Sequence, residues 1–189
     1  MDETRERILS TSRALFADRG YNAVGVQEIC LLSGITKPTL YYHFGNKIGL
    51  LNAVASDLYL GFIAALKEEG SYKGDLAVSL TGSLRVFLRY AAERPDLMRL
   101  RLTLSFSPPS SEEYSVMSPY AERLYEFFKE VFRSASEDHG NMKGRESAYA
   151  ASFIGTADAY AGLRLAGALE PDDQFIRRVV HYFMHGVFS

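Results

Sequence analysis

The sequence predicts an all-α protein of about nine helices, with a small N-terminal domain over residues 1–48 and a larger helical domain over residues 49–189. Three observations predict this class. Apolar residues recur at spacings of three and four along nearly every segment, which is the helical period. No segment alternates apolar and polar residues convincingly as a half-buried strand would. Glycine, proline and short polar stretches separate the segments where helix ends are expected.

The first two helices are short. Thr4 can cap the first, whose apolar stripe runs from Ile8 to Phe16, and Gly20 supplies a C-terminal stop. The second is expected over residues 26–33. Its apolar positions give it one buried face, so both helices can contribute to a small core.

A tight turn at Gly34 leads into the third helix. Thr36 can cap it, and Pro38 falls in its first turn, where a missing N–H costs nothing. The helix is expected over residues 37–44. Three short helices with a glycine turn between the second and third predict a helix-turn-helix, whose last helix enters the major groove of DNA.

Six further helices are expected in the larger domain. Asn46 can cap a long one that ends near Gly70, Asp75 can begin the next, and a short helix follows. Ser118 with Pro119 is expected to start the seventh. The last two are an Ala- and Gly-rich helix and one with a bulky apolar stripe, which suits either a hairpin that pairs with its own copy or an intramolecular core.

Composition limits the function classes. The 189 residues are 47% hydrophobic and 23% charged, enough for a buried core, and a single cysteine excludes an internal disulfide. The charged N-terminus differs from a signal peptide, and no apolar run of membrane-spanning length is expected, so we expect a cytoplasmic protein with no membrane partner. We expect no enzyme activity, cofactor or metal site, because no catalytic motif accompanies the four histidines. The alternative is a metal bound by His181 and His185, four residues apart.

The charge distribution is informative although the net charge is only −2. No acidic residue lies between Glu28 and Asp57, while Lys37, His43 and Lys47 lie there. A polyanion could approach this stretch without meeting a repelling side chain. On a helix over residues 37–44 the apolar positions face the core, and the other faces carry Lys37, Thr39, Tyr41, Tyr42 and His43.

Residues 4–51 resemble the DNA-binding domain of the tetracycline-repressor (TetR) family of bacterial regulators. The matching positions are Phe16, Gly20, Tyr21, Ile29, Gly34, Lys37, Thr39, Leu40, Tyr41, His43, Phe44, Lys47 and Leu50. The resemblance implies a ligand-responsive transcriptional regulator, a repressor rather than an activator, that binds a palindromic operator in double-stranded DNA as a homodimer and is released by a small-molecule inducer. Alternatives are an activator and a DNA-binding adaptor whose large domain binds a protein.

The resemblance also implies site residues. The expected DNA-binding residues are Gly25, Thr36, Lys37, Pro38, Thr39, Tyr41, Tyr42, His43 and Lys47. Of these, Tyr42, His43 and Lys47 are expected on phosphates. Val24 and Gly25 stand where the family usually has a phosphate-binding Ser or Thr, and Pro38 stands where it usually has Gly or Ala, which favours contact with a thymine methyl.

Two further sets concern the larger domain. A pocket for a mostly apolar or aromatic effector, with an anionic one as an option, would be lined by Phe87, Tyr90, Met98, Leu102, Phe106, Tyr125, Phe128, Asp158 and Arg164. A homodimer interface would use Ala151, Ile154, Phe175, Val179 and Phe183. An ordinary helical core accounts for the aromatic residues equally well.

Overall fold

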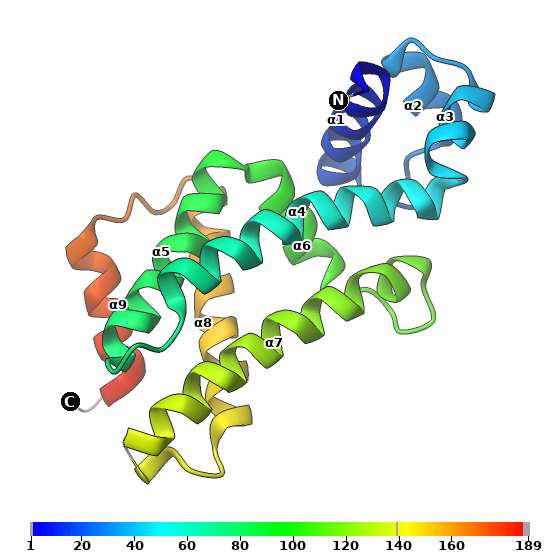
Figure 1. Ribbon diagram of the computed structural model, residues 1–189. Coiled ribbons are helices and arrows are strands. Elements are labelled where there is room, and N and C mark those ends of the chain that lie inside the picture. The colour runs from blue at the N-terminus through cyan, green and yellow to red at the C-terminus, as the bar shows by residue number, and fades with distance from the viewer. Residues whose placement is uncertain (1, 139, 187–189) are drawn as a thin grey trace. The chain divides into compact units, whose positions relative to one another are not determined.

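The computed structural model describes residues 2–138 and 140–186, and the all-α prediction is confirmed over that part of the chain (Figure 1). The helices are α1 (Glu3–Arg19), α2 (Val26–Ser33), α3 (Lys37–Phe44), α4 (Lys47–Gly70), α5 (Leu76–Glu93), α6 (Pro95–Leu104), α7 (Glu112–Asp138), α8 (Glu146–Leu165) and α9 (Asp173–His185), with a 3₁₀ turn η1 at Gly140–Met142.

The chain forms two compact units. The first unit comprises residues 1–60 and 96–120, and the second comprises residues 61–95 and 121–189. This division differs from the predicted domains of 1–48 and 49–189, because the first half of α4 and the segment 96–120 both group with the first three helices. Leu50 and Leu51 in that half of α4 are fully buried.

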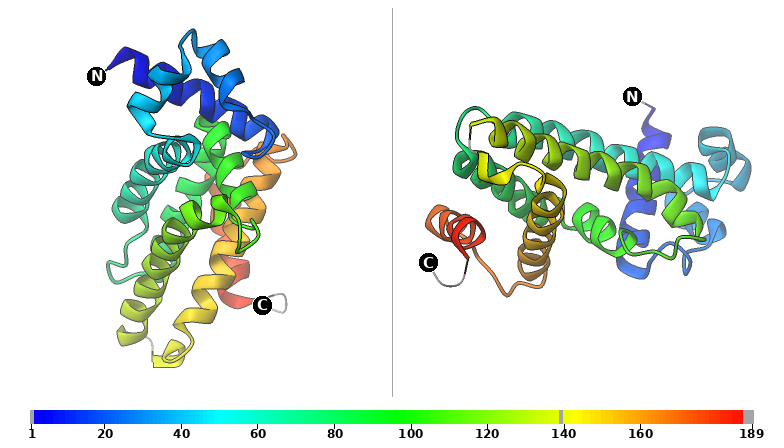
Figure 2. Two further views of the ribbon diagram at one scale, coloured as in Figure 1. Left: turned by 90° about the vertical axis from the view of Figure 1, so that its right-hand side faces the viewer. Right: turned by 90° about the horizontal axis from the view of Figure 1, so that it is seen from below.

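The first unit contains the helix-turn-helix (Figure 2, left). The cap of α1 is Asp2, whose carboxylate accepts from the backbone N–H of Thr4 at 3.1 Å, so the prediction of Thr4 as the cap was wrong. A carboxylate directly before the first helical residue reaches the free N–H groups better than the Thr4 side chain inside the helix. The turn between α2 and α3 has Gly34 in the left-handed conformation, with φ 63° and ψ 39°.

The predicted start and end of α4 agree with the structure. The side chain of Asn46 accepts from the N–H of Gly49 at 2.8 Å, and the helix ends at Gly70. The expectation of no apolar run of membrane-spanning length was wrong, since α4 is 24 residues long with a window of mean hydropathy 1.6. Its fully buried positions include Val54, Leu58 and Phe62 at helical spacing, which is also the pattern of a soluble core helix.

Helix α7 begins earlier than predicted. Its first residue is Glu112, and Pro119 lies inside the helix, so Ser118 does not start it. The hydroxyl of Ser111 accepts from the N–H of Tyr114 at 3.2 Å and caps the first turn. Two glutamates in that turn also stabilise the helix, because their negative charge interacts favourably with the positive end of the helix dipole. These local interactions outweigh the tendency of proline to occupy the start of a helix.

In the second unit α5 packs against both α8 and α9. Aromatic rings form its core: the ring centroids of Phe62 and Phe87 lie 5.0 Å apart, and those of Phe128 and Phe153 lie 5.1 Å apart. All four side chains are fully buried. Small residues on α8, such as Ala157, let it approach α5 closely.

The N-cap of α9 can be used to test how much this helix contributes to the stability of the second unit. Asp172 is the N-cap of the helix, and its carboxylate accepts from the N–H of Phe175 at 2.6 Å. Replacing Asp172 by alanine should lower the free energy of unfolding by about 1 kcal/mol, the usual cost of losing such a cap. Urea denaturation measures the change. Asp172→Asn keeps the acceptor and should retain most of the stability.

Candidate nucleic-acid interface and ligand cavities

Helix α3 is fixed from both ends and from beneath. Leu40 and Phe44 are buried and anchor it on the core of the first unit. At its start the hydroxyl of Thr36 accepts from the N–H of Thr39 at 3.4 Å, and the two hydroxyl groups lie 2.9 Å apart. At its end the N–H of Gly45 donates to the carbonyl of Tyr41 at 2.8 Å. A helix held in this way can present its outer face without rearranging.

The outer face of α3 carries a cation and hydroxyl groups, which are types of group that contact DNA. Lys37 and Pro38 are exposed, and Tyr42 is 84% exposed. Tyr41 is 45% exposed, so part of its ring covers neighbouring residues. Gly25 is the N-cap of α2 and is also exposed. It has no side chain that could accept from the first N–H groups of the helix.

His43 lies differently from the other predicted contacts. Its side chain is only 11% exposed, and its Nδ1 lies 3.4 Å from the carboxylate of Asp2. Its ring meets those of Tyr42 and Phe44, with centroids 5.1 and 6.1 Å away. His43 therefore links the start of α1 to the end of α3. The predicted contact of the His43 imidazole with a phosphate stays a prediction. It would be made beside the carboxylate of Asp2.

Lys47 also has partners within the first unit. Its ammonium group donates to the carbonyl of Tyr21 at 2.7 Å and lies 4.0 Å from the centre of the Tyr21 ring. Burial lowers the pKa of Lys47, while Glu112 and Glu113 act in the opposite direction. The lysine is thus bound to the turn after α1, and the predicted phosphate contact would use its remaining N–H donors.

The first turn of α7 completes this network. Glu112 accepts from the hydroxyl of Tyr21 at 2.8 Å, and Glu113, which is buried, accepts from the side-chain amide of Asn22. Burial and the bond to Glu112 raise the pKa of Tyr21. These two glutamates are not among the predicted site residues, because the seventh helix was expected to start only at Ser118. The available signal was an acidic pair after a serine, which is a helix-start pattern.

Tyr21→Phe tests the network. The change removes the bond to Glu112 but keeps the buried ring and the backbone carbonyl that binds Lys47. We expect a loss of about 1 kcal/mol in the free energy of unfolding, because Glu112 is exposed and regains water. Urea denaturation of the variant and of Tyr72→Phe, a tyrosine of the second unit bonded to Asp138, gives the comparison. A Tyr21→Phe variant as stable as the parent would contradict a structural role for this bond.

The residues predicted to line an effector pocket are divided between the two units. Met98, Leu102 and Phe106 belong to the first unit, and the other six belong to the second. Phe87 and Phe128 are fully buried core residues, whereas Phe106 is 85% exposed. The half-buried members are Tyr90, Leu102, Tyr125, Asp158 and Arg164. None of the nine lines either cavity described below, and their role in ligand binding remains a prediction.

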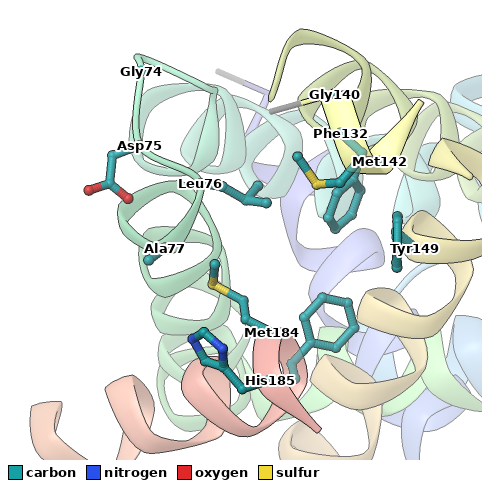
Figure 3. A pocket seen from close by; sticks show the side chains of 11 residues that line it. Gly74, Asp75, Leu76, Ala77, Phe132, Gly140, Met142, Tyr149, Met184 and His185 are labelled. Carbon is teal, nitrogen blue, oxygen red and sulfur yellow. The ribbon is translucent and has the colours of Figure 1, made fainter. Parts of the chain in front are cut away.

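The second unit has two adjoining hollows. The first, which we call the end cavity, has a volume of about 800 Å³ (Figure 3). Its lining residues are Gly74, Asp75, Leu76, Ala77, Phe132, Gly140, Met142, Tyr149, Phe183, Met184 and His185. The second, the basic groove, has a volume of about 700 Å³ and lies between α5 and α9. It is lined by Ala77, Val78, Thr81, Arg85, Gln174, Arg177, Arg178, Val180, His181, Met184 and His185.

The predicted dimer residues fall into two groups. Val179 is buried, and Phe183 packs on Phe153 with ring centroids 5.2 Å apart, so both contribute to the core of their own chain. Phe175 contacts the ring of Tyr160 at 5.5 Å. Ile154 is half-buried and Ala151 is exposed on α8. The exposed face of α8 continues through Gly155, Ala159 and Leu163.

The histidine pair on α9 lies at the surface. The ring centroids of His181 and His185 are 4.5 Å apart, and both side chains are exposed. Within residues 2–138 and 140–186 no group of three or more His, Cys, Asp or Glu side chains is placed to hold a metal ion. Both histidines line the basic groove.

The chain resembles known proteins in sequence and in fold. Residues 8–54 match the family model of bacterial regulatory proteins of the tetR family. The transcriptional activator FasR of Mycolicibacterium smegmatis is 45% identical over 53 residues, which are 28% of this chain and 24% of that protein. YerO of Bacillus subtilis, an uncharacterized transcriptional regulator, is 44% identical over 77 residues, 41% of this chain and 26% of that protein. The alignments with these two relatives thus cover about a quarter of each.

Solved structures share the whole fold. A putative TetR-family regulator from Syntrophomonas wolfei gives a TM-score of 0.78 at 19% identity, covering 99% of this chain and 96% of that one. AibR, solved in complex with isovaleryl coenzyme A and operator DNA, gives 0.72 at 21% identity, covering 93% and 95%. At these identities the likeness establishes the fold of both units.

Proposed function

We propose that this chain, a TetR-family regulator by its DNA-binding domain and its fold, is a repressor that binds a palindromic operator as a homodimer and that a small-molecule inducer releases. The observation that carries the proposal is α3, a rigidly held helix with Lys37 and Tyr42 exposed and no acidic residue between Glu28 and Asp57. Such a helix fits the major groove and its phosphates.

Dimerisation is supported by the exposed face of α8. Ala151, Gly155 and Ala159 are small and exposed, and Leu163 beside them is 46% exposed. Small residues allow two helices to approach closely, and a twofold pair would supply two recognition helices to one operator. The half-sites of the operator should then lie one helical turn apart, about 34–36 Å.

Release by an inducer needs a structural link between the two units. Two helices supply one, because α4 belongs to the first unit up to Leu60 and to the second from Gly61, and α7 passes from one to the other after Tyr120. Each carries a side chain of the network around Tyr21, Lys47 on α4 and Glu112 on α7. A ligand that moves either helix in the second unit would alter that network. A coupling free energy of about 1–3 kcal/mol is typical of allosteric proteins.

Selection of bound DNA from a random pool, with the protein sized in solution, tests the proposal. A palindromic consensus bound by a dimer supports it. A folded protein that enriches no sequence, also after refolding to remove bound ligand, would overturn it. A reporter placed behind the selected operator then separates repression from activation, the alternative suggested by the name of FasR. An adaptor would instead bind DNA without response to any small molecule.

A further inference from the structure

The end cavity and the basic groove share part of their walls. Ala77 on α5 and Met184 and His185 on α9 line both. Figure 3 shows Met184 and His185 side by side on α9, with Ala77 on the helix beside them. The two hollows therefore adjoin along the seam between α5 and α9, and one molecule could occupy both. Their combined size suits a ligand longer than either hollow alone would hold.

The two parts differ in chemistry. Most of the wall of the end cavity is apolar and comes from Leu76, Phe132, Met142, Tyr149 and Phe183, with Asp75 at its edge. Figure 3 shows Leu76, Phe132, Met142 and Tyr149 around a common space. The ring centroids of Phe132 and Tyr149 lie 5.6 Å apart. Methionine side chains adapt to irregular apolar ligands because they are flexible and polarizable. This part of the site suits a hydrocarbon or aromatic body.

The basic groove, by contrast, is polar and positively charged. Arg85, Arg177 and Arg178 line it together with two histidines. Arg85 is paired with Asp173, at 3.1 Å. Arg177 and Arg178 are exposed, and neither forms an ion pair within 4.0 Å among the described residues, so their guanidinium groups are accessible to a ligand. Arginine binds carboxylate and phosphate groups through paired N–H donors.

From this juxtaposition we infer that the end cavity and the basic groove form one binding site for an amphipathic anion, with its apolar body in the end cavity and its acidic head on Arg177 and Arg178. The inference assigns a chemical class to the inducer. That this ligand regulates DNA binding rests on the proposed function. It also differs from the pocket predicted from the sequence, since none of the nine predicted residues lines it.

The chain offers an internal probe. Its five methionines include Met142 and Met184, which line the site, and Met98 and Met117, which are buried in the first unit. In a protein labelled at the methionine methyl carbons, octanoate should shift the signals of Met142 and Met184 and leave those of Met98 and Met117 much less affected. Octanol and octylamine, which share the chain but carry a neutral or a cationic head, should bind at least tenfold more weakly.

Two variants separate the head from the body. Arg177→Gln with Arg178→Gln should weaken octanoate about tenfold or more and leave octanol unchanged, whereas Arg133→Gln, an exposed arginine on α7 outside the groove, should change neither. Ala77→Phe, which fills the shared wall, should weaken both ligands. Equal affinity for the three heads, or shifts absent from Met142 and Met184, would overturn the inference.

Operator binding is measured in parallel with a selected DNA sequence. If octanoate binds the site and weakens operator binding, both the site and its regulatory role are supported. If octanoate binds but operator affinity is unchanged, the site stands and its role as the inducer site fails. If no DNA is bound under any condition while octanoate shifts Met142 and Met184, the proposed function fails and the binding site does not.

Discussion

Replacing Lys37 and Tyr42 together by alanine should weaken operator binding by roughly 30- to 1,000-fold, with no loss of stability. Both side chains are exposed, so neither contributes much to packing. Each contact to a phosphate or base edge is worth about 1–2 kcal/mol, which gives this range for two. If Lys37 contacts a phosphate, the slope of log affinity against log salt should also fall by about 0.9. Fluorescence anisotropy with labelled operator measures both quantities.

The matched control removes the same kinds of group elsewhere in the first unit. Arg99 on α6 and Tyr114 on α7 are exposed, and their replacement by alanine should leave operator affinity within about twofold. Urea denaturation of both double variants checks the fold. A Lys37→Ala, Tyr42→Ala protein that binds operator as well as the parent would mean that α3 is not the helix in the groove. A single Pro38→Gly variant should instead change the preference among operators.

The bounds of α2 and α3 could be predicted from the sequence because their signals are local. Gly34, Thr36 and Pro38 act within a few residues of the helix ends that they define. The exposed positions of α3 follow from helical spacing once Leu40 and Phe44 are assigned to the core. Local chemistry and the fold agree here, as expected for a helix that must be presented rigidly.

The surroundings of His43 and Lys47 could not be predicted in the same way. Lys47 binds the carbonyl of Tyr21, 26 residues earlier, and the carboxylates that act on it come from α7. Spacing along a helix carries no information about such partners. The same holds for the end cavity, which joins α5, η1 and the ends of α7, α8 and α9. Of the aromatic residues predicted to line a pocket, Phe87 and Phe128 are instead buried in the core of the second unit, and Phe106 is exposed.

Lys47→Ala therefore combines two effects. It removes a positive charge from the expected interface, and it leaves the carbonyl of Tyr21 without its ammonium partner. Loss of DNA affinity in this variant alone would not identify a phosphate contact. The shift in salt slope separates the two effects, because a purely structural role changes affinity at every salt concentration alike.

Gly49→Ala should be the most damaging conservative change in the first unit. Gly49 lies in the first turn of α4, and a Cβ atom built there would overlap the backbone carbonyl oxygen of Phe44, the last residue of α3. A backbone atom cannot move aside as a side chain can, so α3 and α4 must separate. We expect a loss of about 1–3 kcal/mol in the free energy of unfolding, the usual cost of overpacking.

The same displacement should reach the DNA, because the junction of α3 and α4 orients the exposed face that carries Lys37 and Tyr42. At a temperature where Gly49→Ala is still folded, operator affinity should fall at least tenfold. The control is Asn52→Ala, an exposed position one turn further along α4, where alanine improves helix propensity and should change neither stability nor binding adversely. Normal operator binding by folded Gly49→Ala would show that the close approach of the two helices does not set the position of α3.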